Sequence, residues 1–385
     1  MDFNLNEEQR MLQDSAAAWF AAHVGGGRTP QSRGQGSGAD EWSDFARLGW
    51  LAVGMPEEFG GFGGGPIEAM ILMEAFGRAG ILEPFMSTAV VGTRAIVRFG
   101  STDLRRTLLP RVARGDLRLG IALYEDPGGC MPEAISTRAV PCDGGFALDG
   151  QKPCVLDAAS ADKLLVAARV AHEEGEVIGL FLVDHATPGL SARSFERLDG
   201  GHASHLRFTD VRVGRDDRIG PEHPGHEILV DLTSTALAAL CAEAVGAMQA
   251  LHDQTLDYLK VRTQFGRPIG QFQVLQHRQV DMLIALEQAR SIVMAACMAL
   301  AEDLPEAGRL LSNAKIAVGK AGRCVAHAAV QLHGGMGMTD ELAVGRHFKR
   351  LAVIDALFGS ADHRLRMHAG ICGKSCGAAT QRADP

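Results

Sequence analysis

The C-terminal part of the chain carries three long runs of helical periodicity, at 232–261, 273–301 and 307–333. Two shorter helical patterns follow, at 341–350 and 360–371. Long helices that are joined by short turns pack side by side and antiparallel, because each must bury its apolar stripe. The sequence therefore predicts that the chain ends in a four-helix bundle.

The middle of the chain has a different texture. Short runs of β-branched and apolar residues alternate there with turn signals, such as Asp143-Gly144-Gly145 and Asp149-Gly150. The N-terminal third is helical again and opens on a capping box at 6–9. We therefore expect an α+β multidomain protein in three parts. These are an N-terminal α-helical domain (1–117), a central β-barrel domain (118–227) and a C-terminal four-helix bundle (228–385).

Composition limits the partners of such a protein. The chain has 385 residues, with 38 Lys and Arg against 46 Asp and Glu, which gives a net charge of −8. A negative chain is not expected to bind nucleic acid. No run of 18 consecutive apolar residues occurs, so no membrane span is expected. The eight cysteines form no CxxC pair, so we expect no metal site. Scattered cysteines without a secretory leader predict a cytoplasmic protein.

The first candidate site is the segment Arg262-Thr-Gln264-Phe265-Gly266, at the end of the 232–261 run. A guanidinium group at this place can bind an anion. A cation near a helix C-terminus also simply complements the helix dipole, so a structural role stays open.

The second candidate is the segment that begins at Gln331 and contains Gly334, Gly335 and Gly337. Glycines at a helix end can form a concave backbone whose N–H groups hold a pyrophosphate. The alternative is a plain helix–helix turn. No strand precedes the segment and no GK[ST] follows it, so it is neither a Rossmann fingerprint nor a P-loop.

The third candidate is Glu243, which lies among apolar and small residues inside the 232–261 run. A helix that is apolar all round is usually buried, and a lone buried carboxylate is costly. Glu243 is therefore either half of a structural salt bridge to an Arg on a neighbouring helix or a general base with a raised pKa.

Taken together, these segments resemble the acyl-CoA dehydrogenase family over nearly the whole chain. The segments 6–9, 56–65, 262–273 and 331–339 fall in the family's order and at its spacing. Within the family the chain is most similar to small subunits of pimeloyl-CoA dehydrogenases, through residues 66–70, 240–248 and 354–363.

The resemblance implies a FAD-dependent enzyme that removes hydrogen from Cα and Cβ of an acyl-CoA, with a dicarboxylyl-CoA as one option. It implies an electron-transferring flavoprotein as the electron acceptor. It also implies a homotetramer or a heterotetramer with a larger related subunit. Carried over by position, the expected FAD contacts are Arg262, Gln264, Phe265, Gln273, Gln331, Gly334, Gly335 and Ser360.

The chain departs from the family pattern where the chemistry is expected. The two positions that carry the catalytic base in family members hold Phe358 and Ala236, and the flavin-facing positions hold Cys154 and Leu156. Glu243 remains as the candidate base, although it lies about 10 Å along the helix from position 236. Three functions stay open. They are an active dehydrogenase with an unusual base, a non-catalytic half-site subunit that supplies FAD contacts to a partner, and a flavin oxidase.

Overall fold

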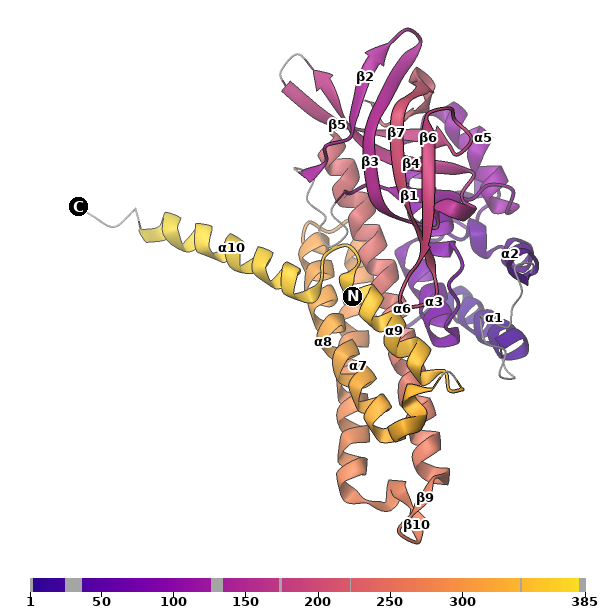
Figure 1. The fold of residues 1–385 in the computed structure, drawn as a ribbon, viewed down its shortest axis with the longest axis vertical. Coiled ribbons are helices and arrows are strands. Elements are labelled where there is room, and N and C mark those ends of the chain that lie inside the picture. The colour runs from indigo at the N-terminus through magenta and orange to yellow at the C-terminus, as the bar shows by residue number, and fades with distance from the viewer. Residues whose placement is uncertain are drawn as a thin grey trace.

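The computed structural model describes residues 3–24, 37–125, 134–172, 175–221, 223–339 and 341–380. A helical domain, a β domain and a helical bundle follow one another along the chain, which confirms the predicted fold class (Figure 1). The β domain lies at one end of the bundle, and the N-terminal helices pack at its side (Figure 1). The exact domain boundaries stay a prediction.

The N-terminal helical domain begins with the predicted capping box. Asn6 Oδ1 accepts a hydrogen bond from the Gln9 amide at 2.8 Å, and Gln9 Oε1 accepts one from the Asn6 amide at 3.0 Å. The N-terminal domain also contains a π-helical segment, η4 (Met86–Gly92). The other elements are α1 (Glu7–Val24), α2 (Ser37–Arg47), η2 (Trp50–Ala52), η3 (Glu57–Phe59), α3 (Pro66–Ala79), α4 (Thr93–Phe99) and α5 (Thr102–Ala113).

The β domain is one eight-stranded sheet with the order β6-β7-β3-β1-β4-β5-β8, in which β2 pairs with β3 and β4. It surrounds its own hydrophobic cluster, which includes Leu148, Leu164 and Phe181. Among the described residues, β6 and β8 each pair with a single strand. The strands are β1 (Leu119–Ala122), β2 (Arg138–Cys142), β3 (Gly145–Leu156), β4 (Lys163–His172), β5 (Gly175–Asp184), β6 (Leu190–Glu196), β7 (His202–Gly214) and β8 (Arg218–Ile219).

Only one of the two predicted turns in this domain is a turn. Cys142 pairs with Gly145 across a tight hairpin in which Gly144 has φ +83°. The Asp149-Gly150 prediction was wrong, because these residues lie inside β3 at a β-bulge. Gly150 adopts φ +148°, and a Cβ there would lie 2.7 Å from Thr137 Cα. Gly150 therefore allows two strands to approach closely. The sequence alone does not distinguish such a glycine from one in a turn.

The bundle is built on α6 (Gly225–Val261), the longest helix. Gly246 lets α6 pack closely on α3, since a Cβ there would lie 1.9 Å from the Glu74 carbonyl oxygen. The remaining elements are β9 (Thr263–Gln264), β10 (Arg267–Pro268), η8 (Ile269–Gln271), α7 (Gln273–Ala301), α8 (Ala307–His333), η9 (Gly334–Met338), α9 (Val344–Ala356) and α10 (Ala361–Thr380).

Two described helices are long and apolar enough to be considered as membrane spans. The most apolar stretch of α6 has a mean hydropathy of 1.7, and 83% of it is buried within the protein. The corresponding stretch of α7 has a mean hydropathy of 1.5, with 44% buried. A buried core helix passes the same test, so the hydropathy of α6 is accounted for by the core. The predicted absence of a membrane span stays a prediction.

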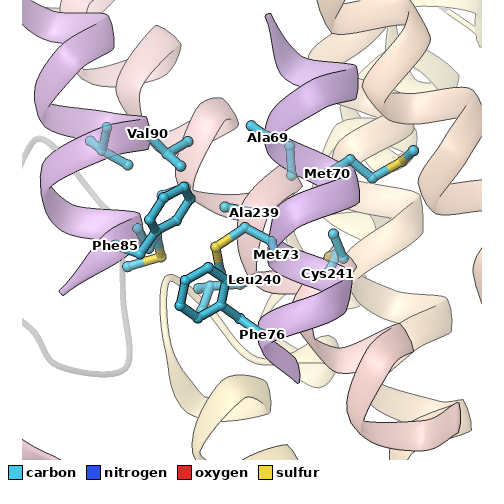
Figure 2. Close-up of a cluster of buried hydrophobic side chains, with 14 of the residues drawn as sticks. Ala69, Met70, Met73, Phe76, Phe85, Val90, Ala239, Leu240 and Cys241 are labelled. Atoms are coloured by element: carbon cyan, nitrogen blue, oxygen red, sulfur yellow. The ribbon is translucent and has the colours of Figure 1, made fainter. Parts of the chain in front are cut away.

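A dense apolar core joins α3, η4 and α6 (Figure 2). Phe76 of α3 stacks on Phe85, which directly precedes η4, with ring centroids 4.7 Å apart. Met73, Ala239 and Leu240 lie beside them, and all of these side chains are buried. This core lies against the face of α6 that carries Glu243 a turn further along.

Candidate functional site

The turn between α6 and α7 presents the first candidate segment at the far end of the bundle (Figure 1). Strands β9 and β10 form a small hairpin in which Gln264 pairs with Arg267. Its two turn residues, Phe265 and Gly266, both have positive φ, at +55° and +75°. The Phe265 side chain is 90% exposed. A positive φ is uncommon for a residue other than glycine, and here it holds an aromatic side chain in solvent.

Arg262 ends α6 and is exposed. Its backbone amide donates to the Tyr258 carbonyl at 2.9 Å, which closes the last turn of the helix. Within the described part of the chain its guanidinium group has no hydrogen bond or ion pair. Arg262 is thus an available cation at the end of the bundle, as a site for a diphosphate requires.

The second candidate segment forms η9 at the same end of the bundle. Tyr258 of α6 stacks on His333 of α8, with ring centroids 4.4 Å apart, and this contact brings the two helix ends together. Gly334 has φ +61°, and no atom lies within 4 Å of a Cβ built at Gly334 or Gly335. Both glycines therefore leave their backbone open to a ligand, which fits a bound phosphate group.

The other predicted cofactor residues fall in two places. Gln273 opens α7, and Gln331 is exposed on the last turn of α8, so both lie near the segments just described. Ser360 lies beyond the opposite end of α9, where its hydroxyl accepts the His363 amide at 3.2 Å and caps α10. The 13 residues of α9 span about 20 Å, so one chain does not bring Ser360 to the other seven residues.

Glu243 is buried on α6 and paired with Arg350 of α9. Arg350 Nε donates to Oε1 at 2.5 Å, and one terminal nitrogen donates to Oε2 at 2.7 Å. Both carboxylate oxygens are therefore held by one guanidinium group in a bidentate pair. Of the two roles predicted for Glu243, this geometry matches the salt bridge to an Arg on a neighbouring helix.

The pair extends into the β domain. Arg350 also donates to Asp199 Oδ2 at 2.7 Å, and Asp199 Oδ1 lies 3.2 Å from Arg197 Nε. The Asp199 side chain is fully buried although it lies between β6 and β7. Burial alone would lower the pKa of Arg350, but the charges of Glu243 and Asp199 raise it overall. The result is a charged network that joins α6, α9 and the β6–β7 connection.

A further carboxylate, Asp157, lies at the edge of this network. It follows β3 with φ +60°, and its carboxylate accepts a hydrogen bond from the Ser87 hydroxyl. Burial raises the pKa of Asp157, against the lowering effects of Ser87, Arg197 and Arg350. The residue before it, Leu156, is buried, and Cys154 is partly buried. The flavin-facing positions of the resemblance thus adjoin the charged network.

A second buried ion pair holds the start of the β domain. The carboxylate of Glu125 accepts hydrogen bonds from the amides and hydroxyls of Ser136 and Thr137, and from Lys152 at 3.2 Å. Burial opposes ionisation of Glu125, but these partners lower its pKa to about 2. Burial lowers the pKa of Lys152 to about 8, against the effect of Glu125. Glu125 therefore ties together the two sides of the connection from β1 to β2.

The two base positions of the resemblance hold no carboxylate. Ala236 is fully buried on α6, and Phe358 adopts φ +53° in the turn after α9. Arg323 donates a hydrogen bond to the nearby Asp355 at 2.9 Å. Among the described residues, no group of three His, Cys, Asp or Glu side chains could hold a metal ion.

The sequence did not identify Arg350 as the partner of Glu243, nor Asp199 and Arg197 as further members of its network. Arg350 is 107 residues away along the chain, and Asp199 comes from another domain. One signal was available for Arg350. It lies between the buried His347 and Ile354 at helical spacing, so a periodicity count on α9 places it on the inner face.

Comparison with known proteins agrees with this architecture. Models of the N-terminal, middle and C-terminal domains of acyl-CoA dehydrogenases match residues 6–116, 120–211 and 233–370. The human mitochondrial short-chain specific acyl-CoA dehydrogenase is 29% identical over 334 residues, covering 84% of this chain and 80% of that protein.

Two solved structures illustrate the likeness in three dimensions. The FAD complex of PigA superposes with a TM-score of 0.87 at 27% identity, covering 97% of this chain and 99% of that one. The ChsE4-ChsE5 complex from Mycobacterium tuberculosis gives a TM-score of 0.85 at 26% identity, with the same coverage.

Proposed function

Since the chain belongs to the acyl-CoA dehydrogenase family, we propose that it is a FAD-dependent subunit that dehydrogenates an acyl-CoA thioester between Cα and Cβ. The observation that carries the proposal is the convergence of Arg262 with Gly334 and Gly335 at one end of the bundle. Bound FAD supplies a two-electron acceptor, and an electron-transferring flavoprotein then takes the electrons.

The chain's own residues would hold the cofactor from several sides. Arg262 offers a forked pair of donors to a diphosphate, and Gly334 and Gly335 offer open backbone. Gln264, Phe265, Gln273 and Gln331 surround that place. Ser360 lies about 20 Å away, so we propose that the FAD contacts of these residues are shared between two chains of an oligomer.

Exposed apolar side chains support an oligomer with a second related chain. Val280, Leu283 and Ile284 are exposed on one face of α7, and Val274 is exposed near the start of the helix. An exposed apolar face on a helix of high hydropathy is typical of a subunit interface. We propose a tetramer, either of identical chains or with a larger related subunit, in the cytoplasm. The ChsE4-ChsE5 complex is a two-protein assembly of this fold.

A second candidate function follows from the pairing of Glu243 with Arg350. A general base needs a free oxygen within reach of the proton it removes. Both oxygens of Glu243 accept hydrogen bonds from Arg350, so neither is free to accept a substrate proton. This pairing favours a half-site subunit, which supplies FAD contacts while a partner performs the proton abstraction. Glu243 acts as the base only if Arg350 releases it.

Arg350 also bears on which class of acyl-CoA the protein would accept. A dicarboxylyl-CoA such as pimeloyl-CoA, which the resemblance suggests, requires a cation for its distal carboxylate. Arg350 is the cation bound to Glu243, and its third contact is with Asp199, between two strands. Such a substrate would therefore have to replace Asp199 on Arg350.

The experiment is to purify the chain alone and together with its partner subunit, and to measure the flavin absorbance and bound FAD of each. The proposed function predicts FAD in the oligomer and bleaching of the flavin when an acyl-CoA is added without oxygen. The half-site candidate predicts bleaching only when the partner is present. Absence of FAD from both samples would contradict both candidates. Rapid reoxidation of the flavin by oxygen would instead favour a flavin oxidase.

A further inference from the structure

We propose that strand β6 and the loop after it form the docking surface for an acidic protein that takes electrons from the flavin. This β6 surface consists of Arg193 and Phe195 on β6, Leu198 in the loop, and His205 and Arg207 on β7. The inference deepens the proposed function and rests on it for the bound flavin.

Strand β6 is exposed along nearly its whole length. Its residues from Ser191 to Glu196 are all exposed, whereas a strand that covers a hydrophobic cluster normally buries every second residue. Among the described residues, β6 pairs with β7 alone. The strand therefore presents a face that the described part of this chain does not cover.

The register between β6 and β7 gathers basic side chains on that face. Arg193 lies directly opposite His205, and Ser191 lies opposite Arg207, so all four side chains point to one side of the sheet. Within the described ranges of the chain, the side chains of Arg193, His205 and Arg207 have no hydrogen bond or ion pair.

The same two strand segments contain no acid. Neither 190–195 nor 202–209 includes an Asp or a Glu, although the chain as a whole has a net charge of −8. Arg193 and Arg207 are diagonal neighbours within reach of each other, and two like charges so placed are unfavourable until an acidic group neutralises them. Charge complementarity therefore selects a partner with an acidic surface.

Two exposed apolar side chains adjoin these cations. Phe195 follows Arg193 on the same face and is 42% exposed, and Leu198 is 64% exposed. The loop that carries Leu198 is fixed from within, because the side chains of its neighbours Arg197 and Asp199 are only 10% and 0% exposed and Asp199 binds Arg350. Apolar side chains with a charged rim are typical of a protein interface.

The position of the β6 surface indicates which acidic protein docks there. Phe195 lies opposite Ala203 on β7, and Ala203 lies opposite Leu156 on β3. Neighbouring strands are about 4.8 Å apart, so Phe195 and Leu156 lie on one face about 10 Å from each other. Leu156 holds a flavin-facing position in the resemblance, and a protein that receives electrons must approach the flavin. The partner we infer is therefore the electron acceptor.

The test reverses the charge of the β6 surface and follows electron transfer. The flavin of the FAD-loaded oligomer is first reduced by light, so that the electron donor does not depend on an acyl-CoA. Purified electron-transferring flavoprotein is then added, and reoxidation of the flavin is followed at low and at high salt. Arg193→Glu with Arg207→Glu should slow reoxidation about tenfold or more at low salt, and much less at high salt.

Two further double variants complete the test. Arg215→Glu with Arg309→Glu is the matched control, because it changes the net charge equally at two exposed positions, one after β7 and one on α8. It should slow reoxidation far less. Phe195→Ser with Leu198→Ser removes the apolar part and should weaken binding of the electron-transferring flavoprotein about tenfold at either salt concentration, as measured by calorimetry.

Three outcomes would overturn the inference and leave the proposed dehydrogenation standing. The first is an equal rate of reoxidation in Arg193→Glu/Arg207→Glu and the wild type. The second is loss of assembly with the partner subunit in that variant, which would make the β6 surface a subunit interface. The third is a wild-type rate that does not fall as salt rises, which decides the matter even if the variant does not fold.

The proposed function fails in a different way. If an acyl-CoA does not bleach the flavin while the light-reduced protein still transfers its electrons in a salt-dependent way, the dehydrogenation is contradicted and the docking surface stands.

Discussion

Arg350 holds Glu243 through two parallel hydrogen bonds, of 2.5 and 2.7 Å, between the inner faces of α9 and α6. The same guanidinium group reaches Asp199 in the β domain at 2.7 Å. A single cation thus connects two helices of the bundle with a neighbouring domain. Glu243 lies among apolar residues in the sequence, but in the structure it belongs to a charged network.

Replacing Glu243 by Gln should destabilise the protein by about 3–5 kcal/mol, because the change leaves Arg350 buried with one of its two acids removed. The measurement is the free energy of unfolding in denaturant. The control is Glu74→Gln, which breaks the partly exposed pair with Arg290 and should cost at most about 1 kcal/mol. If Glu243→Gln keeps wild-type stability but reduces flavin about 10²–10⁴-fold more slowly with an acyl-CoA, Glu243 is the base after all.

Replacing Arg262 by Ala should weaken FAD binding by about 1.5–3 kcal/mol, the contribution of a charged hydrogen bond. Stability without FAD should hardly change, since the Arg262 side chain has no hydrogen bond or ion pair within the described residues. FAD titration of the apoprotein measures the effect. Arg267→Ala is the control in the same hairpin, because that guanidinium stacks on Phe272 at 4.2 Å. Equal FAD affinity in Arg262→Ala and the wild type would remove Arg262 from the site.

Replacing Gly335 by Val tests whether the backbone of η9 approaches the cofactor. The protein itself has room for the side chain, and only Gly334 of the adjoining pair has a positive φ. The variant should therefore fold with nearly the wild-type melting temperature and lose FAD. Gly308→Val, also in open space at the start of α8, is the control and should retain FAD. Retention of FAD by Gly335→Val would make the glycines a plain turn.

Removing Glu125 should destabilise the protein much more than removing its partner Lys152. Glu125→Gln leaves a fully buried lysine without its carboxylate and should cost about 3–5 kcal/mol. Lys152→Met leaves Glu125 with its four hydrogen bonds from Ser136 and Thr137, and should be close to neutral. Similar losses in both variants would contradict this account of the pair.

The same lysine predicts a dependence on pH. Its pKa is lowered to about 8 in the folded protein, so the unfolded chain binds the extra proton between pH 8 and the ordinary lysine pKa of about 10.4. Stability from this group therefore rises with pH across that window. The wild type should gain stability relative to Lys152→Met between about pH 8 and 10, as measured by melting temperature. A difference in melting temperature between the two proteins that does not change with pH would show that the pKa of Lys152 is not lowered.

Much of the fold could be predicted because it depends on local patterns. The helices at 273–301 and 307–333 follow from apolar periodicity, and the capping box at 6–9 follows from two side chains three residues apart. The bulge at Gly150 could not be predicted, since Asp-Gly suits a turn and a bulge equally well.

The site was predictable only in part, for a physical reason. Arg262 and Gly334 stand out because helix ends and glycines have local signatures. The partner of Glu243 depends on which residues two helices bring together across 107 positions, and no local rule supplies that. Asp199 could not be predicted as a buried residue, because a carboxylate between two strands normally faces solvent.

The most direct test of the central claim is anaerobic mixing of the FAD-loaded oligomer with butyryl-CoA or octanoyl-CoA while the flavin absorbance is followed. The account predicts that the oxidised flavin band is lost and that one enoyl-CoA forms for each flavin reduced. Bound FAD that keeps its oxidised band with every acyl-CoA tested, with the partner subunit present, would contradict the account.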